Sequence, residues 1–314
     1  MNHDSLSIAL TLEEFYQDCL ANGFAQRTVQ CYRSDLNLWQ KYLAEHGISS
    51  LREITRESIM DYRYYLQGVH RSPKGKPIAL TTMSNKIAAL KCYMNFCLRS
   101  GKILLNPAEQ LRLPKKPKAL PRGILTKQEI KKLLRVPDIQ TLTGFRDRVI
   151  LELFYATAIR RQELVELKIP DCQLAEKRLL IHGKGNKERW VPIGKKVAEI
   201  LDIYLCQTRP AMVKNKTHES LIVGKLGNPL CAARVHTIVS GYLKQLGIKS
   251  HCHGLRHTVA SHLLKGKANI RVIQEILGHN CLSSTQIYTH VDISDMSKAI
   301  EKAHPRTTMQ VDEI

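Results

Sequence analysis

Six side chains along this sequence could together serve the cleavage of a phosphodiester. A metal-free site for that reaction needs a nucleophile, cations that neutralise the charge around the pentacoordinate phosphorus, and a proton donor for the leaving alkoxide. Arginine suits the second task because its planar guanidinium group can bind two phosphate oxygens at once. The candidates, each in a distinctive local sequence, are Arg160, Lys184, His253, Arg256, His279 and Tyr288.

Tyr288 lies in the stretch LGHNCLSSTQIYTHV, nine positions after His279. A tyrosine in a core helix would normally have Leu, Ile and Val as neighbours, whereas this one follows a run of small polar residues. An ordinary structural tyrosine is the simpler interpretation of the residue taken alone. The polar setting nevertheless suits a segment that must enter a phosphate-lined cleft.

His253 and Arg256 lie three residues apart in CHGLRHTVASHLL, in the opening turn of an expected helix. Residues at that spacing share a helix face, and helix N-termini favour anions. The alternative is that His253 caps the helix and Arg256 forms a salt bridge. Lys184 lies at the tip of an expected β-hairpin, where it could reach over a substrate or simply be solvated.

The chain carries 48 Lys and Arg residues against 28 Asp and Glu residues, a net charge of +20. Residues 1–118 hold 17 basic and 10 acidic groups, and the remaining residues hold 31 and 18. Both parts are therefore positive, which fits a protein that surrounds a polyanion better than one with a basic tail, although a generic basic protein remains the alternative.

Nine scattered cysteines form no C-x-x-C pair, so neither a zinc ribbon nor a disulfide framework is indicated. Free thiols in a reducing compartment are the better interpretation. The N-terminus lacks the features of a signal peptide, and no apolar run approaches the roughly 18 residues of a membrane span. We therefore expect a cytoplasmic protein with no membrane partner, no metal and no cofactor.

The first third of the chain is expected to form a small bundle of four helices. TLEE, at Thr11 to Glu14, has the pattern of a capping box. A helical stripe of apolar residues runs from Val29 to Leu43, a third helix is expected from Thr55 to about Leu66, and a fourth ends at Gly101. The aromatic residues of these stripes are expected to lie in the core.

LPKKPKALPRG, at 113–123, has three prolines, four basic residues and no periodicity, which is typical of an extended linker. It could follow a phosphate backbone or serve as a solvated hinge. Beyond it the patterns predict mainly helices and one small antiparallel sheet, whose hairpin spans Arg178 to Ile193. A final helix is expected with Ser294 as its cap and Met296, Ile300 and Ala303 on one face.

Four motifs in order resemble those of the tyrosine recombinases, the phage-integrase and Xer-like family. YATAIRRQELVEL resembles the first arginine motif of the family, GKGNKERWVPIG its hairpin lysine motif, HGLRHTVASHLL its H-x-L-R-H motif, and LGHNCLSSTQIYTHV its tyrosine motif. The resemblance implies a mainly α fold in two domains. Residues 1–113 would form a SAM-like, DNA-binding bundle, residues 114–122 the basic linker, and residues 123–314 an α+β catalytic domain with a C-terminal oligomerisation helix.

The resemblance also implies a role for each candidate. Tyr288 would attack the scissile phosphate and form a 3′-phosphotyrosyl link. Lys184 would protonate the departing 5′ oxygen. Arg160 and Arg256 would bind the non-bridging oxygens, and His279 a phosphate oxygen. His253 would assist proton transfer or hold the phosphate.

Other matching positions are expected to support the site. Glu163 would brace it from behind, as His257 would, and His290 also matches a family position. Where the family usually has Gly-Leu-Arg, this chain has Ala158-Ile159-Arg160, followed by Arg161. Because the glutamate of the motif lies three residues after its arginine, Glu163 favours Arg160 over Arg161 as the catalytic residue.

The expected function is site-specific DNA recombination by a homotetramer on two double-stranded DNA sites, without metal or ATP. The resemblance implies that the last helix packs on a neighbouring subunit, the alternative being that it packs on its own domain. Three other functions are alternatives: a type IB topoisomerase, a non-catalytic DNA-binding regulator on the same scaffold, and a basic RNA-binding protein. The helix after Tyr288 argues against the topoisomerase, and the full set of catalytic residues argues against the regulator. The low aromatic content argues against the RNA-binding protein.

Overall fold

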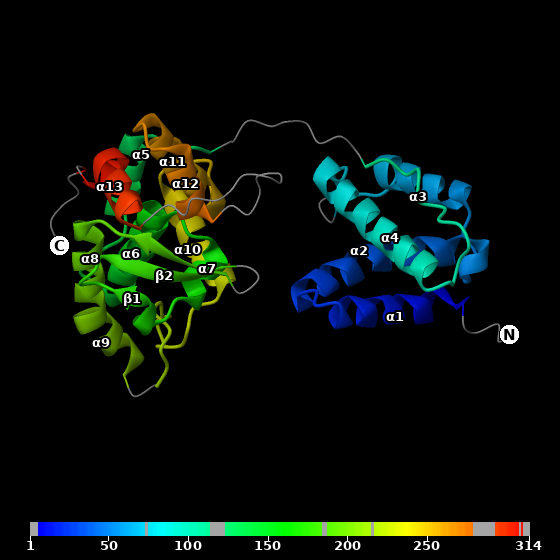
Figure 1. Ribbon diagram of the computed structural model, residues 1–314, viewed down its shortest axis with the longest axis horizontal. Helices are drawn as coiled ribbons and strands as arrows, with labels where there is room; N and C mark the ends of the chain where they lie inside the picture. The colour runs from blue at the N-terminus through cyan, green and yellow to red at the C-terminus, as the bar shows by residue number, and fades with distance from the viewer. Residues whose placement is uncertain are drawn as a thin grey trace. The chain divides into compact units, whose positions relative to one another are not determined.

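The computed structural model of the chain describes residues 6–72, 75–113, 123–183, 187–214, 217–278, 293–307 and 309. The chain divides into two compact units, residues 1–118 and 119–314, each with its own hydrophobic core (Figure 1). Both units are mainly helical, and the described strands form one small sheet in the second unit, so the expected fold class is confirmed.

Unit 1 is a bundle of helices around an aromatic core. Its helices are α1 (Ile8–Ala21), α2 (Gln26–Glu45), α3 (Arg56–Gly68) and α4 (Leu80–Arg99), with a 3-10 turn at Leu51–Glu53. Trp39 of α2 is buried and meets the ring of Tyr93 on α4 edge to face, with 5.6 Å between ring centroids. The large aromatic residues of these stripes therefore hold the bundle together.

Thr11 does not cap a helix, contrary to the expectation from TLEE. Helix α1 begins one turn earlier, at Ile8, so Thr11 lies inside it and is fully buried. Its hydroxyl group bonds the carbonyl of Ser7 and lies 2.6 Å from the hydroxyl of Tyr93. The apolar Ile8 is the reason for the earlier start, because it extends the buried stripe of the helix by a turn.

Unit 2 contains the remaining helices and the sheet. The helices are α5 (Lys127–Arg135), α6 (Leu142–Thr157), α7 (Arg161–Glu166), α8 (Lys195–Ile203), α9 (Arg209–Val213), α10 (Ala232–Gln245), α11 (Cys252–Lys265), α12 (Ile270–Leu277) and α13 (Ile293–Ala303). Shorter turns lie at Ile169–Asp171 and Pro305–Thr307, and a π-helical segment at Tyr204–Thr208 joins α8 to α9. Helix α6 is buried on nearly all sides and forms the centre of the unit.

The sheet has three antiparallel strands in the order β1 (Cys172–Gln173), β2 (Arg178–Gly183) and β3 (Lys187–Pro192). In the β2–β3 hairpin Leu179 pairs with Val191, and Ile181 pairs with Arg189. Leu179, Ile181 and Val191 are fully buried. Because side chains alternate along a strand, Arg189 belongs to the same, core-facing side of the sheet.

Helix α13 packs on its own unit, against β3, α11 and α12 (Figure 1). Met296 and Ile300 are buried in the core of unit 2, and Ala303 packs against it. In this single chain the apolar face of the helix is therefore covered by its own unit. The helix begins at Ile293, one residue before Ser294, the expected cap.

The segment after α13 is fixed by buried polar groups. Arg306 donates from Nε and Nη2 to the two carboxylate oxygens of Glu152 on α6, at 2.6 and 2.8 Å. The same carboxylate accepts from Nε of Arg148 at 3.0 Å. Nε2 of His304 lies 2.9 Å from the carbonyl of Tyr155. Arg306 and His304 thus anchor the end of the chain to the central helix, on which Arg148 also binds the Glu152 carboxylate.

Candidate active site

Arg160 precedes helix α7, and Glu163 within that helix holds it in two ways. The backbone N–H of Arg160 donates to Oε2 of Glu163 at 2.7 Å, and Nη1 of Arg160 donates to Oε1 at 2.7 Å. The Arg160 side chain is 39% exposed, whereas that of Glu163 is 4% exposed. Arg161, the first residue of α7, is exposed. The carboxylate therefore braces Arg160, the arginine favoured by the sequence, from the interior side.

Arg256, in the opening turn of α11, joins the ends of two other helices. Its Nη1 donates to the carbonyl of Ala158 at 2.6 Å, and its Nη2 donates to the carbonyl of Leu277. The residue is only 3% exposed. The helix is capped by His251, whose Nδ1 accepts from the N–H of Gly254 at 3.1 Å. Among the described residues, Arg256 forms no salt bridge, and the cap is His251 and not His253, the residue considered in the alternative above.

Three arginines meet at the C-terminal end of α12. The last carbonyls of a helix have no partner within it and carry partial negative charge, so they attract cations. Here Arg189 donates from Nε to the carbonyl of Ile276 at 3.3 Å, Arg256 to that of Leu277, and Arg160 from Nη2 to that of Gly278 at 3.0 Å. Three consecutive carbonyls thus accept hydrogen bonds from the guanidinium groups of arginines on β3, on α11 and at the start of α7.

Arg189 was not predicted as a site residue. Its Nη1 and Nη2 donate to the two oxygens of Glu163 at 3.1 and 2.9 Å, so it shares this carboxylate with Arg160. A signal for it was present in the sequence. Strand alternation through ERWVP places Arg189 on the same side as Val191, and a charged residue on the core side of a strand needs a buried partner.

Ala158 occupies the position where the family usually has glycine, and it ends α6 in the left-handed conformation, with φ 51° and ψ 24°. That conformation disfavours a residue with a Cβ atom by about 1 kcal/mol relative to glycine. Ala158 is fully buried, and its carbonyl is the acceptor for Arg256. The chain therefore forms a left-handed turn here with an alanine, whose methyl group is buried.

The site is electropositive because three guanidinium groups lie near a single carboxylate, Glu163, which binds those of Arg160 and Arg189. Desolvation by burial, and after it the charge of Arg160, lower the pKa of Arg256 to about 10. Arg256 remains cationic at neutral pH. Burial acts to raise the pKa of Glu163, but hydrogen bonds from Arg189 and Arg160 outweigh it, and the net pKa is lowered. The excess of about two positive charges suits the charge on a phosphate in transfer.

His253 lies on the exposed side of the first turn of α11, next to His257. The two rings meet edge to face, with 4.7 Å between centroids. Desolvation, followed by the charges of His257 and Arg256, lowers the pKa of His253 below its ordinary value of 6.5. A neutral imidazole at pH 7 can accept a proton, which is the state required for a base.

Lys184, His279 and Tyr288 lie outside the described residues, as does His290. Two of them are nevertheless direct neighbours, along the chain, of residues in the site. Gly183 precedes Lys184, and a Cβ atom on it would lie 3.5 Å from Nη1 of Arg189. Gly278 precedes His279, and its carbonyl is the acceptor for Arg160. The structure therefore brings Arg160, Arg256, Glu163 and His253 to one region of unit 2 but leaves the other three unplaced.

Within the ranges given above, no three His, Cys, Asp or Glu side chains are grouped so as to hold a metal ion. Over the same ranges, no helix has both the length and the apolar character needed to cross a membrane.

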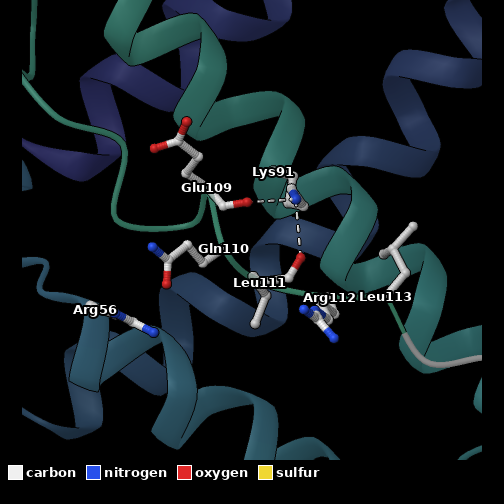
Figure 2. Close-up of a pocket in the computed structure, with 7 residues that line it drawn as sticks. All are labelled: Arg56, Lys91, Glu109, Gln110, Leu111, Arg112 and Leu113. Carbon is white, nitrogen blue, oxygen red and sulfur yellow. Dashed lines mark hydrogen bonds between the residues drawn. The ribbon is translucent and has the colours of Figure 1, made fainter.

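Unit 1 carries a separate open cavity of about 700 Å³ beside the segment that follows α4 (Figure 2). Nζ of Lys91 donates to the carbonyls of Glu109 and Leu111, at 3.1 and 3.0 Å, and so fixes this segment to the helix. Arg56 and Arg112 line the cavity, and both are exposed. The cavity thus presents two exposed cations on a rigid support.

Comparison with known proteins defines the class of both units. The sequence model described as "Phage integrase family" matches residues 124–294. The model described as "Phage integrase, N-terminal SAM-like domain" matches residues 12–101. The chain belongs to the phage integrase family.

Curated relatives extend the match to most of the chain. It is 35% identical over 304 residues to Tyrosine recombinase XerC 2 of Ralstonia nicotianae, covering 96% of this chain and 87% of the relative. It is 34% identical to Tyrosine recombinase XerD of Staphylococcus aureus, covering 91% and 95%. The predicted family and enzyme class are confirmed, and the chain is a tyrosine-type site-specific DNA recombinase.

Solved structures agree on the fold. A lambda integrase tetramer bound to a Holliday junction aligns with a TM-score of 0.69 and 19% identity, over 93% of this chain and 82% of that chain. At this identity the likeness concerns the architecture alone.

Proposed function

We propose that Tyr288 is the nucleophile of strand cleavage and that Arg160 and Arg256 bind the scissile phosphate. The phenol oxygen attacks phosphorus, the bond from phosphorus to the 5′ oxygen breaks, and a 3′-phosphotyrosyl link remains. Lys184 supplies the proton that the 5′ oxygen requires. Religation reverses these steps with a 5′-hydroxyl group from another strand, so the bond energy is kept in the link and no ATP is needed.

One observation carries this proposal: two of the arginines named from the sequence donate to the consecutive carbonyls of Leu277 and Gly278. His279 is the next residue of the chain. The arginines come from elements more than 90 residues apart, so a purely local structural role does not account for their meeting. Arg160, with 39% of its side chain exposed, is the group that a phosphate meets first. Arg256 is proposed to bind the phosphate through N–H groups other than those that it donates to Ala158 and Leu277.

His253 is proposed as the acceptor of the proton that Tyr288 loses. A phenol has a reference pKa near 10, so it needs a base close by to react at neutral pH. The lowered pKa of His253 keeps its imidazole neutral and therefore able to accept. The neighbouring guanidinium groups also favour the phenolate.

The two units are proposed to contact DNA together, as residues 1–113 and 123–314 joined by the basic linker at 114–122. Arg56 and Arg112 of the unit 1 cavity are suited to phosphate contacts because both are exposed cations beside a segment that Lys91 fixes. The working form is proposed to be a homotetramer on two duplexes, by analogy with the integrase tetramer on a Holliday junction. In that assembly α13 would leave its own unit for a neighbour. A cytoplasmic location, where DNA is present, fits the scattered free cysteines.

The experiment is a trapping assay in buffer with EDTA. Duplexes that bind the protein are first selected from a random library, and the enriched site is then made with a nick near the cleavage position, so that the cleaved strand diffuses away. A covalent protein–DNA adduct on denaturing gels supports the proposal, and its absence with a tightly bound site contradicts it. A parallel assay on a supercoiled plasmid separates the topoisomerase alternative, which predicts relaxation without recombinant products.

A further inference from the structure

Arg189 connects three parts of the site through a single guanidinium group. Two of its nitrogens bind the two oxygens of Glu163, and the third binds the carbonyl of Ile276. The side chain is 10% exposed, and Val191 and the pairing partner Ile181, on the same side of the sheet, are apolar and buried. A planar fork that meets both carboxylate oxygens fixes the plane of the carboxylate as well as its position.

Glu163 in turn has no oxygen left for another partner. Oε1 accepts from Nη1 of Arg160 and from Nη1 of Arg189, and Oε2 accepts from the backbone N–H of Arg160 and from Nη2 of Arg189. Without Arg189 the carboxylate would rotate toward Arg160, the remaining cation. Arg160 would then be held more closely by Glu163 and less available to a phosphate.

Gly278 makes room for this guanidinium group, and Gly183 lies at ordinary contact distance from it. A Cβ atom on Gly278 would lie 3.0 Å from both Cζ and Nη1 of Arg189, and one on Gly183 would lie 3.5 Å from Nη1. These glycines directly precede His279 and Lys184 in the chain. Arg189 therefore packs against the backbone from which both of these residues continue.

We propose that Arg189 is a positioning residue for strand cleavage, which sets the orientation of Arg160 through Glu163 and ties the end of α12 to the β2–β3 hairpin. This rests on the function proposed above for Arg160. Arg189 itself does not touch the phosphate. Its loss is expected to slow the chemical step while leaving DNA affinity nearly unchanged.

The test compares Arg189→Gln and Arg189→Lys with Arg178→Gln as the matched control. Arg178 lies on the neighbouring strand, where its guanidinium group stacks on Trp190 and pairs with Glu176, away from Glu163. Single-turnover cleavage of the nicked duplex is measured beside the dissociation constant and the melting temperature. We expect cleavage to slow by about 10- to 100-fold in Arg189→Gln, the range typical of residues that orient a functional group. The affinity should stay within about threefold, and the control should match the wild type.

A double-variant cycle shows whether Arg189 acts through Arg160. In an Arg160→Ala background, adding Arg189→Gln is expected to slow cleavage by less than about twofold, because the residue that it orients is gone. If Arg189→Gln slowed cleavage by the same factor in the Arg160→Ala background as in the wild-type background, the proposal would be overturned. If the Arg160→Ala protein alone cleaved at the wild-type rate, the proposed function would be overturned instead.

Arg189→Lys covers the case in which Arg189→Gln fails to fold. It keeps the charge but cannot bind both oxygens of Glu163 at once, so a folded Arg189→Lys protein should be slow as well. A folded Arg189→Lys protein that cleaves within twofold of the wild type would overturn the proposal.

Discussion

Arg160 and Glu163 bind each other twice, once through the backbone N–H of the arginine and once through its guanidinium group, both at 2.7 Å. The contact makes Glu163 the partner of Arg160 and not of Arg161, which is exposed at the first position of α7. Two adjacent arginines are therefore in different environments, although the sequence alone left their roles to be decided by register.

This difference predicts opposite results for the two arginines. Arg160→Ala should slow single-turnover cleavage by roughly 10²–10³-fold, the effect expected when one donor to the transition state is lost. Arg161→Ala should change the cleavage rate by less than about threefold, with a small loss of DNA affinity. The reverse pattern would show that the register assigned from Glu163 is wrong.

The histidine pair on α11 predicts an acid limit for cleavage. If His253 must be neutral to accept a proton, the rate should fall as the pH drops through its lowered pKa, that is, below 6.5. The charge of His257 contributes to that lowered value, so His257→Gln should move the acid limb to higher pH. Single-turnover cleavage rates measured between pH 5 and 8, at saturating protein, test the acid limit of the wild type and its shift in His257→Gln. An unchanged acid limb in His253→Gln would assign the titration to another group.

His304 predicts a pH dependence of stability. Burial lowers its pKa to about 4 in the folded chain, against 6.5 for an exposed histidine. The unfolded state therefore binds the proton first as the pH falls. The stabilisation is complete above pH 6.5 and is lost between pH 6.5 and about 4, by up to about 1.4 kcal/mol per pH unit.

Denaturant unfolding of the wild type and of His304→Gln at several pH values isolates this contribution. The variant should be the less stable protein at pH 7, because it loses the contact with Tyr155, and the gap should narrow toward pH 4. A gap that stays constant over this range would show that His304 is not buried in its neutral form.

The unit 1 cavity predicts a salt-dependent loss of DNA binding. Each phosphate contact removed should reduce the slope of log K against log[salt] by about 0.9. Arg56→Ala and Arg112→Ala should each show this reduction over 50–200 mM salt. Arg33→Ala is the control, because Arg33 is exposed too but its guanidinium group is held by Glu13. A slope that Arg56→Ala and Arg112→Ala leave unchanged would place the cavity away from the DNA.

The fold was largely predictable because its helices carry clear apolar stripes and the hairpin is marked by glycines. The stretch from Lys195 to Val213 was not predicted. There the π-helical segment at Tyr204–Thr208 inserts a residue and Pro210 follows, so the 3.6-residue period is interrupted. The packing of α13 was left open between its own unit and a neighbour, because its apolar face fits either equally well by pattern.

The candidate site, like the fold, was predictable from the sequence only in part. Arg160, Arg256 and Glu163 stand in motifs, and the structure brings them together. Arg189 was missed because a strand arginine in a basic hairpin resembles any solvated cation until its side of the sheet is known. His251 was missed as the cap of α11 because a histidine is an uncommon cap, and His253, two residues later, had been considered for that role.

The central claim, that Tyr288 is the nucleophile, is tested most directly by mapping the covalent adduct. The trapped complex is digested with protease and the peptide that carries the nucleotide is sequenced by mass spectrometry. The account predicts that the nucleotide is on Tyr288, that Tyr288→Phe forms no adduct while binding DNA normally, and that Tyr64→Phe, a change at an exposed tyrosine of unit 1, behaves as the wild type. An adduct on any other residue, or one formed by Tyr288→Phe, would contradict it.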